Sequence, residues 1–466
     1  MLGSWLRKPA EWGVDPVPQD QRRLRAIDLG VLWFSLGVGL LVLFAGALLV
    51  FLGLSLFEVL WVSILGSVIG SLMLAAAGLT GSRHGVPTMV SLRPVLGRKA
   101  SWIPSGINSL QLVGWASFEF MIMGIALSLV SGPLLGSATV YVWIAVLAVW
   151  VTLLALGGPL LVIRKWLERF AVWLVVASTI WLTYLVVTHP GFLTNFFAVP
   201  SAGTRNLGVG LDLVIAMPIS WWPLVSDYNR FARRPRDSFA GTFLGYTLSN
   251  SWFYFLGAAI LVVFGLADQS AGPVAFVQAI VGTVLGSLVL LLIIVDETDN
   301  AFANVYSTAV SAQNIAPRAS QRRLVIGTAL IAFFVGSAIA SEWQVFAALY
   351  EGFLLFVGGV FVPLLGVLIA DQWVRQRYEA AEFADRAPAV KGIALVSWIF
   401  GIATYVSVNG IGLVGTENVL MGPLWASPVG ASLPAFFVAG GLHAVLSRTA
   451  SFLAARHAPV SGGGNP

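Results

Sequence analysis

Long apolar stretches alternate with short polar segments along nearly the whole chain. A membrane-spanning helix needs about 20 mostly apolar residues, and twelve such stretches occur between residues 28 and 447. The period-two alternation of a membrane β-strand is absent, and only helices or closed barrels satisfy every backbone polar group in lipid. The pattern therefore predicts an all-α integral membrane protein with twelve transmembrane helices. Their approximate limits are 28–52, 57–79, 103–130, 139–163, 170–188, 207–227, 239–266, 274–312, 322–341, 345–371, 391–410 and 429–447.

The composition agrees with this class and excludes several kinds of chemistry. Hydrophobic residues make up 58% of the chain and charged residues 10%, with a mean hydropathy of +0.87, whereas soluble proteins carry about 25% charged residues. There is no cysteine and there are only four scattered histidines, so we expect no thiolate site and no metal centre. The chain is also expected to have no catalytic group and no cofactor. The net charge of +5 arises from basic residues between the apolar stretches, which gives no reason to expect a nucleic-acid partner.

The basic residues predict which helix ends face the cytoplasm. If the amino terminus is inside, alternate connecting segments hold 25 of the 26 Lys and Arg residues, and only Arg205 falls outside. Cytoplasmic loops of membrane proteins carry such an excess of positive charge. We therefore expect a multi-pass protein of the cell membrane, with cytoplasmic tails at 1–27 and 448–466.

Helix-breaking residues interrupt the first and sixth predicted helices. The first contains Gly37, Gly39 and Gly46, and the sixth contains Pro218 and Pro223. Proline removes a backbone donor and clashes with the preceding turn, while glycine weakens a helix or allows close packing between helices. Close packing with a simple kink is therefore an alternative to a true break in both helices.

The positions of the two interrupted helices suggest an internal repeat. If the first ten helices form two groups of five, each group begins with an interrupted helix, which is the layout of inverted-repeat transporters with a binding site at the midplane. The repeats then comprise residues 28–188 and 207–371, and two additional helices occupy 391–447.

Three carboxylates lie inside the eighth apolar stretch, in the segment LLLIIVDETDNAFANVYSTAV. Asp296, Glu297 and Asp299 follow six apolar residues, with no Lys or Arg close by. A carboxylate in hydrocarbon costs roughly 2.5–3.5 kcal/mol even on insertion scales, so the three acids are expected to line a polar cavity, bind a cation or carry protons. A solvated loop between two shorter helices is the alternative. On one helix, a single stripe would contain Asp296, Asp299, Asn300, Ala303 and Asn304.

The third predicted helix carries a second polar stripe. Gln111, Trp115 and Glu119 recur at intervals of four residues, so they share one face. An indole between an amide and a carboxylate suits a flat heterocycle, which stacks on the ring while its polar edge is hydrogen-bonded. A tryptophan at the membrane interface is the alternative reading of Trp115.

These motifs resemble the purine–cytosine permease family, the type-1 nucleobase–cation symporters. The resemblance covers about residues 28–385 and rests on GRKASWIPSGINSLQLVGW, SDYNRFARRP, DNAFANVYS and GVLIADQWVRQRY. The stretches INSLQLVGW and MPISWWPLVSDYNRF are most similar to the cytosine and hydroxymethylpyrimidine permeases. The resemblance implies a five-plus-five inverted-repeat bundle with discontinuous first and sixth helices, followed by two extra helices.

The resemblance also implies roles for individual residues. Trp115 matches the stacking tryptophan of the family, Glu119 matches a position that hydrogen-bonds substrate, and Gln111 lies near another such position. The second stacking aromatic of the family falls near Pro218, so Trp221 or Trp222 is expected to replace it. Asp299 and Asn300 are expected to contribute to the substrate site.

The coupling site departs from the family pattern. Members with a sodium site use backbone carbonyls of the first helix and adjacent hydroxyls of the eighth. The matching eighth-helix positions here are Asp296 and Glu297, and the first-helix positions are Ser35 and Gly37. Two neighbouring carboxylates suit either a cation or a proton, so H⁺ and Na⁺ both remain as coupling ions.

The sequence thus predicts a secondary active transporter that imports a nucleobase-like heterocycle, such as cytosine, a purine or hydroxymethylpyrimidine, by cation symport with alternating access. A transporter of the same fold for another small substrate is the main alternative, and a channel is a further one. An intramembrane aspartyl protease is disfavoured because three acids share one helix and no GxGD motif occurs. The sequence contains no GxxxxGK[ST] motif, and this argues against an ATP-driven pump. The particular base and the oligomeric state are left open.

Overall fold

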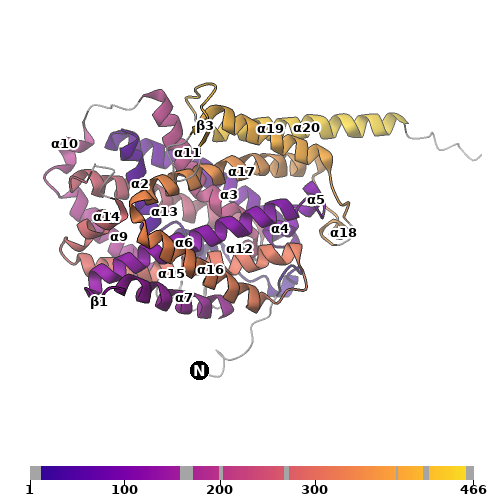
Figure 1. The fold of residues 1–466 in the computed structure, drawn as a ribbon. Helices are drawn as coiled ribbons and strands as arrows, with labels where there is room; N and C mark the ends of the chain where they lie inside the picture. Colours follow the sequence, from indigo (N-terminus) through magenta and orange to yellow (C-terminus); the bar gives the residue numbers. More distant parts are fainter. Residues whose placement is uncertain are drawn as a thin grey trace, which may run out of the picture.

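The structure, a computed structural model, describes residues 12–157, 172–198, 203–266, 272–384, 387–412 and 419–457. These residues form a bundle of long helices (Figure 1). The end of the fourth predicted helix, the start of the fifth, residues 1–11 of the first predicted tail and residues 458–466 of the second lie outside the described residues. So do six of the basic residues used to predict the orientation, namely Arg7, Lys8, Arg164, Lys165, Arg169 and Arg386.

The twelve predicted spans are confirmed as helices within the described residues. Nine helices there are long and apolar enough to cross a membrane, and one bent pair makes a tenth span. The other two spans are α9, whose predicted start is not described, and α15, which carries the acids. The spans of the first predicted repeat are α1 (Ala26–Ser35) with α2 (Leu40–Phe51), α3 (Leu56–His84), α6 (Trp102–Ser131), α7 (Thr139–Gly157) and α9 (Val172–Val187). Those of the second are α11 (Thr204–Trp221) with α12 (Val225–Asn229), α13 (Pro235–Val263), α15 (Gly286–Ile315), α16 (Gln321–Ser341) and α17 (Phe346–Arg375), followed by α19 (Gly392–Asn409) and α20 (Ser432–His457).

Short elements occupy the connections. They are helices α4 (Thr88–Ser91), α5 (Arg93–Leu96), α10 (Phe192–Phe196), α14 (Gly272–Val281) and α18 (Ala380–Phe383), and strands β1 (Leu134–Ser137), β2 (Ile411–Gly412) and β3 (Val419–Met421). Strands β2 and β3 pair in antiparallel fashion between α19 and α20.

The overlong eighth span divides into two helices. The short helix α14 ends at Val281, the backbone turns through Leu285 with φ of 60°, and α15 then continues unbroken for 30 residues. The three acids therefore lie inside one buried helix, each with at most 1% of its surface exposed. This placement excludes the alternative of a solvated loop.

Both predicted helix interruptions are present, and they differ in form. Helices α1 and α2 meet at an angle of 59° across residues 36–39. In the sixth span, α11 continues through Pro218 and gives way to a 3₁₀ turn at Trp222–Leu224, which contains Pro223, before α12 begins. The shorter-pitched turn accommodates a proline that an α-helix interior disfavours.

Glycines also allow close packing beside the first break. A Cβ atom at Gly37 would lie 2.1 Å from Ser249 Oγ, and one at Gly46 would lie 2.0 Å from the carbonyl oxygen of Tyr254. Both neighbours belong to α13, so α1 and α2 pack directly against that helix. Close packing and a true break thus coexist in the first span, because Gly37 and Gly46 pack against α13 beside the break.

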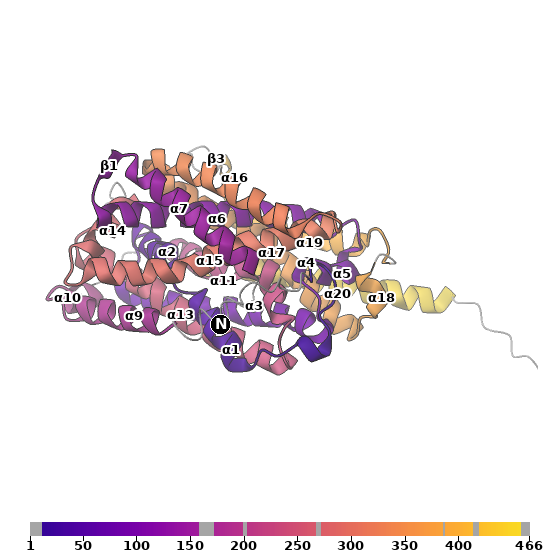
Figure 2. The ribbon, with the colours of Figure 1, turned by 90° about the horizontal axis from the view of Figure 1, so that it is seen from below.

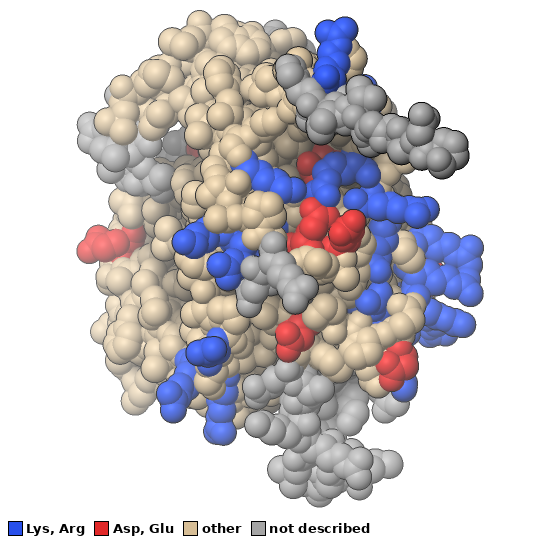
Figure 3. All heavy atoms as spheres, turned by 90° about the vertical axis from the view of Figure 1, so that its right-hand side faces the viewer, with Lys and Arg blue, Asp and Glu red and all other residues tan. Residues whose placement is uncertain are grey.

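Helix α15 runs through the bundle beside α6 and contacts α16, α7 and α9 (Figure 2). The polar stripes of α6 and α15 are thereby brought together in the interior. Lys and Arg side chains gather on the face at the right of Figure 1, where α5 and α18 lie, as Figure 3 shows. We call this face the basic end of the bundle.

Candidate functional site

The site is built where α15 meets the break between α1 and α2. Ser35 Oγ, at the end of α1, donates a hydrogen bond of 2.5 Å to Asp296 Oδ1. The backbone N–H of Leu40, at the start of α2, donates to Glu297 Oε2 at 2.6 Å. Asn300 Nδ2 donates to the carbonyl oxygen of Val38 at 2.9 Å. A helix break frees backbone groups that need partners in lipid, and side chains of α15 supply some of them.

Glu297 approaches the backbone closely at Gly39, where any larger residue would require the carboxylate to move. A Cβ atom at Gly39 would lie 2.4 Å from Glu297 Oε2. The carboxylate sits at the N-terminus of α2, where the helix dipole favours a negative charge. The two adjacent acids therefore bind opposite sides of the break, Asp296 at α1 and Glu297 at α2.

Asp299 has no comparable hydrogen bond to the helix break. It is 1% exposed, and neither of its carboxylate oxygens has a hydrogen-bond partner among the described residues. Asp296 Oδ2 is also unpartnered. No Lys or Arg in the described ranges forms an ion pair with any of the three acids. Buried charges without counter-charges are strongly unfavourable, so the site requires a proton, a cation or a polar ligand.

The stripe on α6 faces α15 and α11. Glu119 Oε1 accepts a hydrogen bond of 2.9 Å from Asn304 Nδ2 of α15. Gln111 Nε2 donates to Asn108 Oδ1 at 2.8 Å and to the Ser220 carbonyl oxygen of α11 at 3.0 Å. These bonds fix both side chains while leaving one oxygen of each without a partner. The buried polar atoms of the stripe that have no partner in the described residues are Gln111 Oε1, Trp115 Nε1 and Glu119 Oε2.

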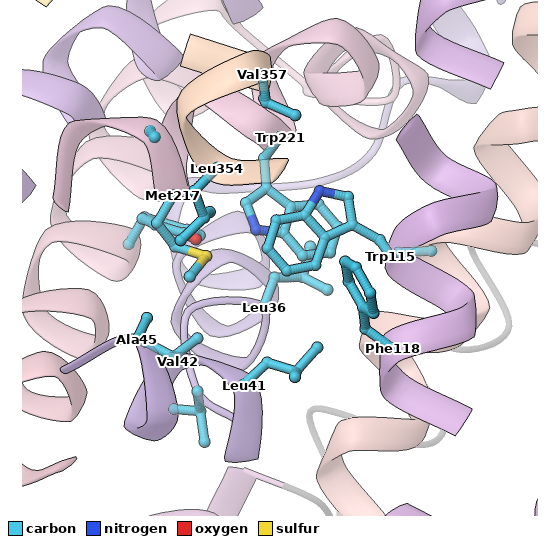
Figure 4. Close-up of a cluster of buried hydrophobic side chains, with 14 of the residues drawn as sticks. Leu36, Leu41, Val42, Ala45, Trp115, Phe118, Met217, Trp221, Leu354 and Val357 are labelled. Carbon is cyan, nitrogen blue, oxygen red and sulfur yellow. The ribbon is translucent and has the colours of Figure 1, made fainter. Parts of the chain in front are cut away.

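Two indoles point into one apolar cluster beside these polar atoms. Figure 4 shows Trp115 from α6 and Trp221 from the end of α11 directed into the same group of side chains, together with Leu36 from the break and Met217. The two rings are 5% and 6% exposed. Each packs edge-on against another aromatic ring, Trp115 against Phe353 at 5.2 Å and Trp221 against Trp33 at 6.4 Å between ring centroids. The site therefore combines aromatic faces with unpartnered polar groups.

A family model described as "Permease for cytosine/purines, uracil, thiamine, allantoin" matches residues 16–420. The chain belongs to this permease family. The membership confirms the resemblance seen in the sequence and identifies the chain as a transporter and not an enzyme, which removes the protease alternative.

Two relatives and one solved structure show how far the similarity to this permease extends. The cytosine permease of Escherichia coli strain K12 is 28% identical over 434 residues, covering 88% of this chain and 91% of the relative. The hydantoin permease of Microbacterium maritypicum is 22% identical over 382 residues, covering 78% and 75%. A nucleobase-cation-symport-1 family transporter, solved in a closed conformation with bromovinylhydantoin bound, has a TM-score of 0.76 at 17% identity, covering 95% and 96%. The predicted inverted-repeat transporter fold is thereby confirmed.

The structure of the permease separates the two tryptophans that the sequence left as alternatives. Trp222 is fully buried, and its Nε1 donates to the carbonyl oxygen of Phe361 in α17 at 3.0 Å. It therefore faces α17, whereas Trp221 is the indole that Figure 4 shows directed toward Trp115. Pro218, at the family's aromatic position, packs against Gly70 of α3. Trp221, three residues further along the chain, is the aromatic side chain that is directed toward Trp115.

The remaining predicted residues are placed as follows. Ser35 and Asn300 lie at the break with the acids, whereas Gly37 packs against Ser249 of α13 and makes no described contact with Asp296 or Glu297. The sequence reading missed the bond from Asn304 to Glu119. Helical spacing had already placed Asn304 on the polar stripe of the eighth helix. Nothing in that stretch indicated that its partner would be Glu119, which lies on another helix.

Proposed function

We propose that this permease imports a flat, nucleobase-like heterocycle by cation symport with alternating access. The observation that carries the proposal is the set of buried, unpartnered polar atoms of Gln111, Glu119 and Asp299 beside the indoles of Trp115 and Trp221. Buried polar groups without partners are unfavourable, and a planar ring with donors on its edge would satisfy them. Cytosine, a purine and hydroxymethylpyrimidine all have this character.

In this proposal the ring stacks on Trp115, with Trp221 as the opposite wall. Glu119 Oε2 and Gln111 Oε1 accept hydrogen bonds from the ring N–H or exocyclic amine, because their other polar atoms are already bonded within the protein. Asp299 and Asn300 complete the polar edge from α15. Trp222 stays outside the substrate site and supports α17.

We assign the coupling ion as a proton. Asp296 and Glu297 bond to different sides of the helix break, so in this conformation their carboxylates do not converge on one cation. A proton needs no convergent ligands, and its uptake by this pair of acids removes the cost of an uncompensated buried charge. A sodium ion between the acids and the break is the alternative, since oxygen ligands suit a hard cation.

The proposed orientation places both termini and the basic end in the cytoplasm of the cell. The gathering of Lys and Arg side chains at that end supports it, because cytoplasmic loops are enriched in positive charge. We further propose that residues 28–188 and 207–371 are the two inverted repeats. Their relative rocking would expose the site to each side in turn.

The test is uptake of labelled cytosine into cells that lack their own base permeases, with unlabelled competitors. Saturable accumulation that hypoxanthine or hydroxymethylpyrimidine inhibits supports the proposal. If none of the bases is accumulated or competes, the substrate assignment is wrong, and the permease carries another small molecule on the same fold.

Glu119→Gln is expected to change the ranking of substrates. The glutamine keeps the length of the side chain but replaces one acceptor oxygen with an NH₂ donor. Bases that present a donor to Glu119 should bind about 10-fold more weakly, since a hydrogen bond to a charged group contributes about 1.5–3 kcal/mol. Competition profiles with cytosine, uracil, hypoxanthine and hydroxymethylpyrimidine measure this, and identical profiles for both proteins would contradict the assigned role.

Trp221→Phe and Trp222→Phe are expected to act on different properties. Trp221→Phe reduces the stacking surface and should weaken base binding about 3- to 10-fold, a part of the stacking contribution seen in nucleic-acid proteins. Trp222→Phe removes the bond to Phe361 and should lower thermal stability by about 1 kcal/mol, with affinity unchanged. Binding and melting curves of the two purified variants distinguish them. Equal losses of affinity would refute the assignment of Trp221 alone to the site.

A further inference from the structure

The segment that precedes α1 is packed onto the bundle. Residues 12–24 cross the end at which α3, α12 and α15 terminate, and we call this segment the strap. Val17 of the strap is 1% exposed and Leu24 is fully buried. Chain termini are usually poorly ordered unless specific contacts hold them, so these buried side chains indicate that the bundle holds the strap in place.

One set of contacts fixes the strap to α3. The N–H of Val17 donates to the carbonyl oxygen of Gly85, the residue that caps α3, at 2.8 Å. Arg22 Nε donates to the carbonyl oxygen of Val17 at 2.9 Å, and its Nη1 donates to the carbonyl oxygen of Arg83 at 3.2 Å. The guanidinium of Arg22 therefore lies at the C-terminus of α3, where the helix dipole favours a positive charge.

A second set of contacts fixes the strap beside the end of α12. The N–H of Leu24 donates to the carbonyl oxygen of Phe231 at 2.9 Å, and the carbonyl oxygen of Leu24 accepts from the N–H of Arg233 at 2.7 Å. Leu24 and Ala232 thus form a parallel bridge. The strap is therefore held at both α3 and α12 by backbone hydrogen bonds.

Helix α12 covers α15 on the side of the transport site that faces the basic end. Tyr228 Oη donates to the carbonyl oxygen of Ala303 at 3.4 Å, and the ring of Tyr228 lies 6.2 Å from that of Tyr306. Tyr306 follows Asp299 by two helical turns, or about 10 Å along α15. For the site to open toward the basic end, α12 and α15 have to separate here.

Arg230 connects the strap, α12 and α15. Its guanidinium is 0% exposed, and its Nη1 donates to the carbonyl oxygen of Gly13 at 2.7 Å while its Nη2 donates to Tyr306 Oη at 3.4 Å. A Cβ atom at Gly13 would lie 3.1 Å from Gln313 Oε1, in the last turn of α15. A buried charge is costly unless it is hydrogen-bonded, so the strap stabilises Arg230 in this position and Arg230 holds the strap against α15.

We propose that the strap closes the transport site on the cytoplasmic side and that Arg230 is the positioning residue that latches it. In the closed state Arg230 binds Gly13 of the strap and Tyr306 of α15 together. In the open state the strap leaves α15, and water reaches the site from the basic end. The inference rests on the alternating access of the proposed function, but it does not depend on which heterocycle or ion is carried.

The first test measures access to the buried face of α15. The chain contains no cysteine, so a single Ser307→Cys substitution beside Tyr306, at a fully buried position, reports access without background. A membrane-impermeant maleimide added to inverted vesicles should react slowly with this cysteine. Adding Arg230→Gln should make the reaction about 10-fold faster, which corresponds to about 1.4 kcal/mol and is the size of one hydrogen bond from a charged donor. Arg230→Lys keeps a charged donor and should restore most of the slow rate.

The matched control is Arg233→Gln, which removes the same charge from an exposed side chain and keeps the backbone bond to Leu24. It should leave the labelling rate unchanged. Maleimide added to the outer face of intact cells distinguishes a gate from a damaged fold. If Arg230→Gln raises labelling equally from both faces, or if Arg233→Gln raises it as much, Arg230 is not a latch and the proposal is overturned. Labelling needs no substrate, so a failure of base uptake would remove the substrate assignment and not the gate.

The second test asks whether the strap has to leave α15 during transport. In the double variant Gly13→Cys/Gln313→Cys, the two thiols lie close enough for a short bis-methanethiosulfonate reagent to join them. Cross-linking should reduce uptake of labelled cytosine at least 10-fold, and a reductant should restore it. The two single variants, treated in the same way, should keep their uptake. Undiminished uptake by the cross-linked protein would show that the strap stays on α15 throughout the cycle, and the proposal would be wrong.

Discussion

Asp296→Asn and Glu297→Gln are each expected to abolish accumulation of base driven by a pH gradient, while exchange of base across the membrane continues. Each amide keeps an oxygen that can accept the hydrogen bond from Ser35 or from the Leu40 N–H, so the break between α1 and α2 is preserved. Neither amide can carry a titratable proton. The loss should therefore be confined to coupling.

The magnitude follows from the energy of the gradient. A difference of one pH unit stores about 1.4 kcal/mol per proton, which supports about 10-fold accumulation of substrate for one coupled proton. Proteoliposomes with an alkaline interior should reach this ratio with the unmodified permease and a ratio near one with either variant. Counterflow of labelled base against unlabelled base measures the retained exchange.

One control variant and three contrary outcomes test the assignment of the proton to these acids. Glu351→Gln removes a half-buried carboxylate on α17 and should leave accumulation intact. If exchange and accumulation fall together in the α15 variants, the acids hold the helix break but do not carry the ion. Accumulation driven by a sodium gradient alone would overturn the assignment of a proton, and full activity of the double variant would remove both acids from the mechanism.

Features that depend on one segment could be predicted from the sequence. Hydropathy and the distribution of basic residues identified the spans, and helical spacing placed Gln111, Trp115 and Glu119 on one face. Spacing also placed Asp299 and Asn304 on a common stripe. The eighth span was predicted too long, because the apolar character continues through the turn at Leu285 that separates α14 from α15.

Features that depend on two segments could not be predicted in this way. Nothing in the eighth span shows that Glu297 reaches the N–H of Leu40, because the contact joins helices 257 positions apart in sequence. The choice between Trp221 and Trp222 likewise depended on the 3₁₀ turn that begins at Trp222. Neighbouring residues on a helix point about 100° apart, so Trp221 is directed toward Trp115 and Trp222 faces α17.

Trp115→Ala is expected to weaken base binding about 5- to 150-fold, because base–aromatic stacking contributes roughly 1–3 kcal/mol in nucleic-acid proteins. The indole also packs on Phe353 and Tyr350, and its removal leaves a cavity that destabilises the fold by about 3–5 kcal/mol. Trp115→Phe separates these effects, since it keeps a stacking face and most of the packing. Its affinity should lie between those of the unmodified protein and the alanine variant.

The matched control is Trp143→Ala on α7, where the half-buried indole donates to Ser131 Oγ at 3.0 Å and does not enter the cluster. Affinity is measured by displacement of labelled cytosine from purified protein, and melting curves verify that each variant is folded at the assay temperature. The site assignment predicts that Trp143→Ala changes stability but not affinity. If the Trp115 and Trp143 variants lose affinity equally, or if Trp115→Phe binds no better than Trp115→Ala, the aromatic face of α6 is not where the heterocycle stacks.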